Sequence, residues 1–289
     1  MFVILGGNGY VGKVFQRSLS AAGQDFTVIS RKLNDYSTPD ALLDCLRETS
    51  ASFVINAAGY TGRPNVDACE IHKAECLAGN AVLPGIVREV CEHLRLPWGH
   101  VSSGCIYTGS KPDGTGFTEE DAPNFSFRQN NCSFYSGCKA LGEEVLSGAE
   151  QCFVWRLRIP FDEHDSPRNY ISKMIRYDRL LNATNSLSQL TEFANASIAC
   201  WMNRVDFGIY NLTNPGCVTT REVVDMIARH VLSDKQFSFF RSEQEFMQQA
   251  ASTPRSNCVL DVSKARAAGL SLSPVHEAVE RALKNWNPR

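Results

Sequence analysis

The chain has 289 residues, of which 43% are hydrophobic and 21% are charged, and this is enough for one large α/β domain or two closely packed lobes. Its formal net charge of −2 excludes the overall electrostatic footprint of a protein that binds nucleic acid or anionic membranes, so we expect neither partner. No apolar run approaches the length of a membrane span, and the first expected strand begins directly after Met1, which indicates a cytoplasmic protein.

Short β-branched or aromatic runs alternate with helical patterns in the first half of the chain, which is typical of βαβ units and a parallel sheet. We expect strands at residues 2–5, 26–30, 52–56, 97–103 and 153–157. We expect helices at residues 10–22, 39–49, 81–94 and 135–146. Two long irregular stretches, 109–132 and 158–170, interrupt this alternation, and loops of such length are often functional.

Three glycines separate the first expected strand from the first expected helix. Glycines permit a tight turn and a close backbone approach, and the N–H groups at the start of the helix then face a pyrophosphate. The position of the loop between strand and helix favours a dinucleotide site over a merely structural turn. Its candidate cofactor-binding residues are Gly6, Asn8, Gly9, Tyr10, Val11 and Gly12.

Arg31 and Lys32 follow the second expected strand, where an acidic residue would hold the ribose hydroxyl of NADH. An arginine there suits a 2′-phosphate, so NADPH is favoured, with NADH as the alternative. The pair could instead be solvated surface charges. Asp35 is a weaker candidate that would flank the adenine.

The expected fold is therefore α/β, a Rossmann-type doubly wound parallel sheet with a smaller C-terminal α/β substrate-binding lobe. Residues 1–160 would form the NADP-binding domain, with 190–215 returning to it. Residues 161–189 and 216–289 would form the substrate-binding lobe, because after Gly216 the pattern changes to mixed helices and short strands. Eleven cysteines without any C-x-x-C pair indicate free thiols and no metal site.

Ser103, Tyr135 and Lys139 have the spacing of a hydride-transfer triad. Tyr135 and Lys139 are four residues apart and share one face of a helix. A phenol has a pKa of about 10, which a neighbouring ammonium is expected to lower. Lys139 can also hold a nicotinamide ribose hydroxyl, and Ser103 can bond the carbonyl oxygen that Tyr135 protonates.

Several further segments carry a family resemblance, and they occur in order along the chain: NAAGYTGRPNVD at 56–67, SGCIY at 103–107, SFYS at 133–136, PRNYISK at 167–173, NLTNPG at 211–216 and RSN at 255–257. With them the chain resembles an extended short-chain dehydrogenase/reductase of the dTDP-4-dehydrorhamnose reductase group throughout its length. In motif it is most similar to the bifunctional nucleotide-rhamnose synthases, or epimerase-reductases, of plants and large viruses.

Cys105 and Lys173 distinguish the subfamilies within this resemblance. Plain reductases usually carry an acidic residue in place of Cys105, and the bifunctional GDP-fucose synthases pair the cysteine with a histidine. The bifunctional rhamnose enzymes pair Cys with Lys, as this chain does. The pair suits inversion at carbons 3 and 5 beside the carbon-4 ketone, which needs a base on one face and an acid on the other. The structural alternatives are a buried cysteine at a strand end and a solvated helix lysine.

The resemblance also implies roles for binding residues. Ala57, Ala58 and Tyr60 would line the dinucleotide, Asn80 would support the active site and Pro160 would adjoin the nicotinamide. The implied substrate contacts are Arg63, Asn65, Ser103, Gly104, Cys105, Arg168, Asn169, Lys173 and Arg255. Arginine forks suit a diphosphate, although Arg255 could instead form a surface ion pair.

The resemblance implies a 3,5-epimerase and NADPH-dependent 4-reductase that converts an NDP-4-keto-6-deoxyglucose to NDP-L-rhamnose. A reductase without epimerase activity is one alternative, and a non-catalytic NADP-binding regulatory subunit, which could lose Tyr135 or Lys139, is another. The sequence leaves open UDP or dTDP as the nucleotide and whether the chain forms a homodimer. A separate 4,6-dehydratase would have to supply the substrate.

Overall fold

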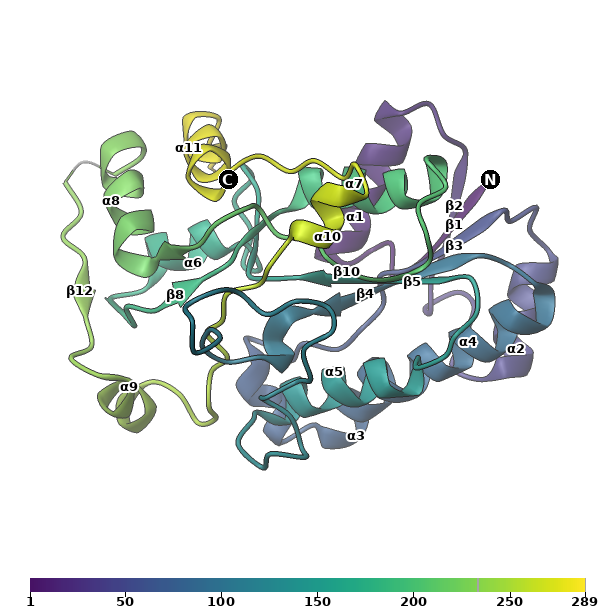
Figure 1. Ribbon diagram of the computed structural model, residues 1–289, viewed down its shortest axis with the longest axis horizontal. Coiled ribbons are helices and arrows are strands. Elements are labelled where there is room, and N and C mark those ends of the chain that lie inside the picture. The colour runs from purple at the N-terminus through teal and green to yellow at the C-terminus, as the bar shows by residue number, and fades with distance from the viewer. Residues whose placement is uncertain (233, 289) are drawn as a thin grey trace.

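The computed structural model describes residues 1–232 and 234–288, and a parallel sheet lies at its centre (Figure 1). Within the described residues this sheet has six strands in the order β10-β5-β4-β3-β1-β2. They are β1 (Phe2–Leu5), β2 (Phe26–Ile29), β3 (Phe53–Asn56), β4 (Trp98–Ser103), β5 (Cys152–Leu157) and β10 (Gly208–Asn211). Every pairing is parallel, and the strand order reverses between β1 and β3, so the expected Rossmann-type fold is confirmed.

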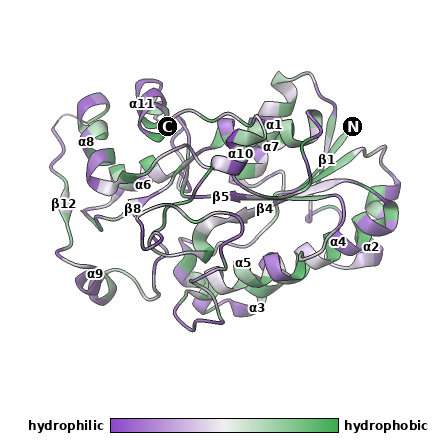
Figure 2. Cartoon of the chain, in the orientation of Figure 1, coloured by the Kyte–Doolittle hydropathy of each residue, from purple (hydrophilic) through white to green (hydrophobic). Residues whose placement is uncertain are grey.

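Helices cover both faces of the sheet, which is why β1, β3, β4 and β5 are buried along their whole length. On one face lie α1 (Tyr10–Ala21), α7 (Leu190–Met202) and α10 (Ser263–Ala267), and on the other α2 (Pro39–Arg47), α4 (Leu83–Leu94) and α5 (Phe134–Val145) (Figure 1). Phe15 and Trp155 anchor the first core layer, and Val87 and Trp98 belong to the second. Hydrophobic and hydrophilic residues alternate along α2 and α5, as an amphipathic covering helix requires (Figure 2).

The helix expected at 81–94 differs from its prediction. α3 (Lys73–Leu77) runs into a π-helical turn, η2 (Ala78–Val82), before α4 begins. The carboxamide of Asn80 in this turn donates to the carbonyl oxygens of Tyr60 at 2.7 Å and Cys76 at 3.0 Å. Apolar periodicity does not detect such a turn, because its single extra residue hardly changes the helical pattern; turns of this kind are frequent at functional sites.

The C-terminal lobe combines helices with short strand pairs. Its helices are α6 (Tyr170–Arg176), α8 (Thr220–His230), α9 (Glu243–Gln249) and α11 (Val275–Lys284). Its strands are β6 (Pro160–Phe161), β7 (Arg179–Leu180), β8 (Thr184–Asn185), β9 (Ser188–Gln189), β11 (Val218–Thr219) and β12 (Ser238–Phe239). The 3₁₀ turns η1 (Val66–Glu70) and η3 (Gly104–Ile106) lie in the loops after β3 and β4. Phe161, Ile171, Val223 and Val279 belong to a separate apolar core that joins α6, α8 and α11.

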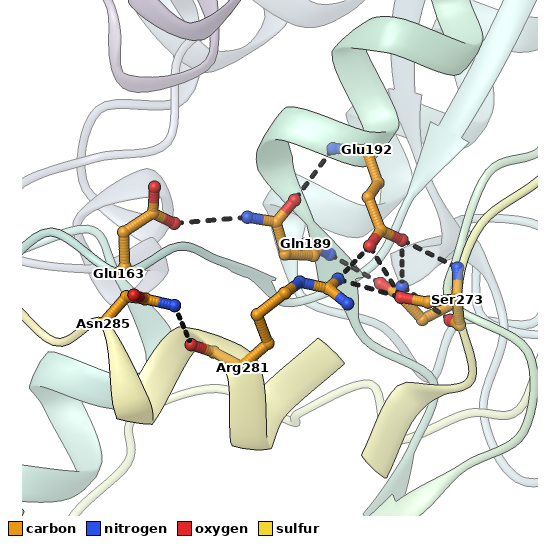
Figure 3. A network of polar contacts seen from close by, with 7 residues as sticks. Glu163, Gln189, Glu192, Ser273, Arg281 and Asn285 are labelled. Carbon is orange, nitrogen blue, oxygen red and sulfur yellow. Dashed lines mark hydrogen bonds and ion pairs between the residues drawn. The ribbon is translucent and has the colours of Figure 1, made fainter. Parts of the chain in front are cut away.

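A polar network fastens this lobe to the sheet (Figure 3). Glu192, in the first turn of α7, accepts hydrogen bonds from the backbone nitrogen of Ser273 at 2.9 Å and from its hydroxyl at 2.6 Å, and pairs with Arg281 of α11. Gln189 donates to Glu163 at 3.3 Å in the segment that follows β6. Since the network joins α7, α11 and the segment after β6, it fixes the lobe at one end of the sheet.

Candidate active site

A cavity of about 1560 Å³ lies where the carboxyl ends of β1, β3, β4 and β5 meet the C-terminal lobe. Parallel sheets bind ligands at this edge, beside the point where the strand order reverses. The volume exceeds the roughly 300–1,000 Å³ that suffices for one small ligand, which leaves room for a cofactor and a substrate together. The expected site residues that line it are Asn8, Gly9, Tyr10, Val11, Ala57, Ala58, Tyr60, Arg63, Asn65, Asn80, Ser103, Cys105, Tyr135, Lys139, Pro160, Arg168, Lys173 and Arg255.

The glycine loop has the geometry of a dinucleotide site. Gly6 has φ +74°, and a Cβ there would lie 2.5 Å from the backbone nitrogen of Ala58. A Cβ on Gly12 would lie 2.3 Å from the carbonyl oxygen of Gly6. Gly6 and Gly12 thus shape the turn behind the cavity without lining it. Gly9 has no side chain that could cap α1, so the first N–H groups of this helix are free for an anion.

The basic pair expected at the cofactor's ribose lies outside the cavity. Arg31 and Lys32 are exposed, and the Arg31 guanidinium lies 5.6 Å from the centroid of the Tyr36 ring. Asp35 accepts a hydrogen bond from the backbone nitrogen of Ser37 at 3.0 Å and does not line the cavity either. These three residues follow Ser30, whose hydroxyl accepts a hydrogen bond from the Asn8 side chain of the glycine loop at 3.2 Å. Their contact with a cofactor stays a prediction.

Ser103, Tyr135 and Lys139 line one part of the cavity. Ser103 ends β4, while Tyr135 and Lys139 are held in the first turns of α5, whose N-cap Ser133 accepts a hydrogen bond from the Ser136 nitrogen at 3.2 Å. The Lys139 ammonium donates to the carbonyl oxygen of Val101 at 3.0 Å. Burial lowers the pKa of Lys139, whereas Cys105 and Glu143 oppose that shift.

The expectation of a lowered Tyr135 pKa is wrong. Burial raises the pKa of Tyr135 well above its usual value, and negative charge on an ionised Cys105 would act in the same direction. The ammonium of Lys139 is directed to Val101 instead. Tyr135 is therefore a protonated phenol, which is the form that donates a proton to a carbonyl oxygen.

Asn80 supports the loop after β3. Its side-chain oxygen accepts a hydrogen bond from the Tyr60 nitrogen at 3.2 Å, and its nitrogen donates to the Tyr60 carbonyl oxygen at 2.7 Å. A Cβ on Gly59 would lie 3.1 Å from the Asn80 oxygen and 3.9 Å from the Lys139 nitrogen. Asn80 thereby lies between the cavity wall at 57–60 and Lys139 of α5.

Cys105 and Lys173 face the same cavity from opposite lobes, Cys105 in η3 and Lys173 in α6. Burial raises the pKa of the Cys105 thiol, against smaller opposing effects of Ser103 and Arg158. Burial also lowers the pKa of Lys173, and the positive charges of Arg168 and Arg255 lower it further. The arrangement thus combines a thiol that stays protonated with an amine that loses its proton easily.

Four of the expected substrate residues, besides Ser103, Cys105 and Lys173, line the cavity: Arg63, Asn65, Arg168 and Arg255. Arg168 donates to the carbonyl oxygen of Gly62 at 2.6 Å, and Arg63 is exposed on the same wall. The ion pair considered for Arg255 exists, since its guanidinium holds both carboxylate oxygens of Asp67 at 2.7 Å, yet Arg255 also lines the cavity. Asn65 lines it too, while its side chain caps η1.

Two expected contacts are placed elsewhere. Asn169 is fully buried and does not line the cavity; its carboxamide donates to Asp162 at 3.0 Å and caps α6 through the nitrogen of Ile171 at 3.0 Å. It therefore positions the helix of Lys173. Gly104 is buried beneath Leu260, because a Cβ on it would lie 2.6 Å from that side chain.

Sequence reasoning missed Arg158, which is buried with 6% exposure and lines the cavity. Its guanidinium donates to Asn185 at 2.7 Å, and its charge lowers the pKa of both Tyr135 and Cys105, against the larger effect of burial. The only available signal was an arginine directly after a buried strand. Sequence reasoning also missed the aromatic side chains that α9 and the segment after β12 contribute to the cavity wall.

Among the residues that the structure describes, no group of three or more His, Cys, Asp or Glu side chains could hold a metal ion. Within the same ranges all eleven cysteines are free thiols. None of the described helices is long and apolar enough to cross a bilayer.

Curated relatives resemble this chain over most of its length. An Arabidopsis thaliana protein named bifunctional dTDP-4-dehydrorhamnose 3,5-epimerase/dTDP-4-dehydrorhamnose reductase is 34% identical over 283 residues, which cover 96% of this chain and 90% of that protein. A trifunctional UDP-glucose 4,6-dehydratase/UDP-4-keto-6-deoxy-D-glucose 3,5-epimerase/UDP-4-keto-L-rhamnose-reductase of the same plant is also 34% identical. Its match covers 91% of this chain but only 38% of the trifunctional protein.

Solved structures show the same fold. The L780 UDP-rhamnose synthase of Acanthamoeba polyphaga mimivirus superposes with a TM-score of 0.89 at 23% identity, covering 98% of both chains. A dTDP-4-dehydrorhamnose reductase of Bacillus anthracis, solved in complex with NADP, superposes with a TM-score of 0.81 at 19% identity, covering 99% of this chain and 97% of the other. The family described as RmlD substrate binding domain matches residues 1–287, and the chain belongs to this family.

Proposed function

We propose that the chain is a bifunctional 3,5-epimerase and NADPH-dependent 4-reductase that converts an NDP-4-keto-6-deoxyglucose, with UDP or dTDP as the nucleotide, to NDP-L-rhamnose. The observation that carries the proposal is the position of Cys105 and Lys173 in the same cavity as Ser103, Tyr135 and Lys139. Reduction needs only the last three residues. The additional acid and base are explained by inversion at carbons beside the ketone.

Inversion precedes reduction, because the hydrogens on carbons 3 and 5 are acidic only while carbon 4 is a ketone. The Lys173 amine removes the proton from one face, and the electron pair of the broken C–H bond moves onto the carbonyl oxygen. Ser103 and Tyr135 donate hydrogen bonds to that oxygen and stabilise its negative charge. The Cys105 thiol then delivers a proton to the opposite face, and exchange with solvent restores both groups.

The residues present fit NADPH, since the free N–H groups at the start of α1 suit a pyrophosphate and Gly6 leaves no space for a side chain. NADPH supplies the hydride that carbon 4 accepts. Tyr135 is protonated at neutral pH, so it can give its phenolic proton to the carbon-4 oxygen, which becomes a strong base as the hydride arrives. Lys139 places a positive charge in the same cavity, where it stabilises the phenolate that remains.

Deuterium exchange separates the two activities. UDP- and dTDP-4-keto-6-deoxyglucose are incubated in deuterated water with the protein and NADP⁺, which permits inversion but no reduction. We expect proton NMR to show deuterium at carbons 3 and 5 together with the inverted sugar, and Cys105→Ala to abolish the inversion, because no acid then protonates the opposite face. Reduction of NDP-4-keto-L-rhamnose without any exchange in the wild type would establish a plain reductase instead. Binding of NADPH with neither reaction would favour the regulatory subunit.

A further inference from the structure

The cavity continues past the catalytic residues to a wall to which α9 and the segment after β12 contribute. Figure 1 shows these two elements next to each other along the chain, at the end of the molecule away from the N-terminus. Phe240 and Phe246 line this wall, with ring centroids 5.3 Å apart and an interplanar angle of 71°. Their neighbour Phe239 packs against the core of the C-terminal lobe, whereas neither Phe240 nor Phe246 belongs to an apolar core cluster of the described residues. Half-buried aromatic rings that face a cavity in this way are available to a flat ligand.

The charged and aromatic side chains on this side of the cavity are arranged in order from Lys173 to the two phenylalanine rings. The pKa of Lys173 is lowered by burial and by the charges of Arg168 and Arg255, so both guanidinium groups lie near that amine. The Arg255 guanidinium in turn lies 6.0 Å from the centroid of the Phe246 ring, and Phe246 contacts Phe240. The wall therefore leads from a catalytic lysine, past two arginines, to an aromatic pair.

A nucleoside diphosphate sugar has its parts in the same order: reacting sugar, diphosphate and base. Arg168 suits the diphosphate, because its guanidinium bonds a carbonyl oxygen and no ion pair joins it to a carboxylate in the described part of the chain. Arg255 is partly neutralised by Asp67, which holds it in place between the lysine and the rings. The aromatic pair is then left for the base.

We propose that Phe240 and Phe246 form the binding site for the nucleobase of the substrate, an inference that rests on the proposed function for the identity of that substrate. Phe246 is the stacking ring, since it lies between Arg255 and Phe240. The Arg179 guanidinium, which also lines the cavity, packs on Phe240 at 4.2 Å from its ring centroid. Arg179 is itself held by Glu245 at 2.9 Å and by Gln249 at 2.8 Å.

Gln249 makes this site selective for bases that carry a carbonyl group. Its side-chain oxygen accepts a hydrogen bond from Arg179, which orients the amide and leaves its hydrogens available to a ligand. Their acceptor within the protein, a Glu245 oxygen, lies at 3.5 Å, the outer limit of a hydrogen bond. Uracil and thymine present two carbonyl oxygens to such a donor, whereas adenine presents none. Gln249 also lines the cavity, so the site should prefer uridine and thymidine nucleotides to adenosine nucleotides.

Calorimetric titration tests the site directly. The probes are UDP, dTDP, ADP and inorganic pyrophosphate, each added to the full chain with NADP⁺ at saturation so that the glycine loop is occupied. We expect UDP and dTDP to bind more tightly than ADP. Phe246→Ala should weaken UDP binding about 5- to 150-fold, the range for loss of one base-stacking ring, and leave pyrophosphate binding unchanged. Gln249→Ala should reduce the preference for UDP over ADP.

Two variants control for misfolding of Phe246→Ala. Phe246→Tyr keeps an aromatic face and should bind UDP as the wild type does. Phe207→Ala removes a ring that is 41% exposed and packs on Phe153 outside the cavity, so it should not affect UDP binding. Unchanged UDP affinity in Phe246→Ala, or equal losses for UDP and pyrophosphate, would overturn the assignment. Weakened UDP binding in Phe246→Ala would support it even if the wild type showed no deuterium exchange, a result that would remove the proposed chemistry alone.

Discussion

Replacing Lys173 by methionine tests the assignment of the base. Methionine has a similar length and lacks the amine, so Lys173→Met removes proton transfer while keeping most of the packing. A positioned acid or base contributes about 10²- to 10⁴-fold, or about 2.7–5.5 kcal/mol of activation free energy, and we expect deuterium exchange to slow by that factor. The positive neighbours Arg168 and Arg255 repel the ammonium, so its loss leaves no buried charge unpaired and the melting temperature should not fall.

The assay compares two reactions of the same variant. Exchange at carbons 3 and 5 is followed by proton NMR, and reduction of NDP-4-keto-L-rhamnose, which needs no inversion, is followed by NADPH absorbance. Lys173→Met should lose the first and keep the second. Lys284→Met, on α11 with its side chain 61% exposed, is the matched control and should change neither reaction. Exchange at the wild-type rate in Lys173→Met would refute the assignment of Lys173 as the base.

Three further predictions follow from the same geometry. Tyr135→Phe should slow the reduction of NDP-4-keto-L-rhamnose about 10²- to 10⁴-fold, measured by NADPH absorbance, because the phenol that protonates the carbon-4 oxygen is lost. The exchange rate should fall with decreasing pH as Lys173 becomes protonated, at a pH below the ordinary lysine pKa, and should fall again at high pH as Cys105 ionises above its ordinary value. Arg156→Met should lower the free energy of unfolding in urea by about 3–5 kcal/mol. It removes the guanidinium that donates to the buried Glu143 carboxylate at 2.6 Å and leaves that charge without its ion-pair partner.

Each of these predictions has a control. If Tyr135→Phe oxidised NADPH at the wild-type rate, a group other than Tyr135 would have to donate the proton. In Lys173→Met, the fall of any residual exchange rate with decreasing pH should disappear. If that fall persists, a group other than Lys173 causes it. Arg128→Met breaks the exposed pair between Arg128 and Glu144, whose side chains are 74% and 41% exposed, and should leave the urea midpoint almost unchanged. Equal losses of stability in Arg128→Met and Arg156→Met would contradict the reasoning on burial.

Much of the fold could be predicted because its signals are local. The apolar runs that became β1 and β3 are buried on both faces, and the glycines at positions 6 and 12 occupy places where the backbone leaves no space for a Cβ. Helix starts were also readable: α2 begins with Pro39 after Thr38, whose hydroxyl accepts from the Ala41 nitrogen at 3.3 Å. Such features depend on neighbouring residues, so a single sequence displays them.

The departures depend on contacts between distant segments. Burial of Tyr135 outweighs nearby charge and reverses the expected direction of its pKa shift, and burial follows from the packing of the whole site. Asn169 lies within a family motif, yet its carboxamide is directed to Asp162, seven residues earlier in the same irregular stretch, and no sequence pattern indicates how that stretch folds back on itself. Phe240 and Phe246 stand in a weakly patterned region, and only the folded lobe brings them to the cavity that holds Lys173.

The measurement that tests the central claim most directly is proton NMR of the reaction product formed by this chain alone. The protein is incubated with NDP-4-keto-6-deoxyglucose and NADPH in deuterated water, with no second enzyme present. The account predicts NDP-L-rhamnose with deuterium at carbons 3 and 5. Product that forms only after a separate 3,5-epimerase is added would contradict it, because Cys105 and Lys173 would then perform no inversion.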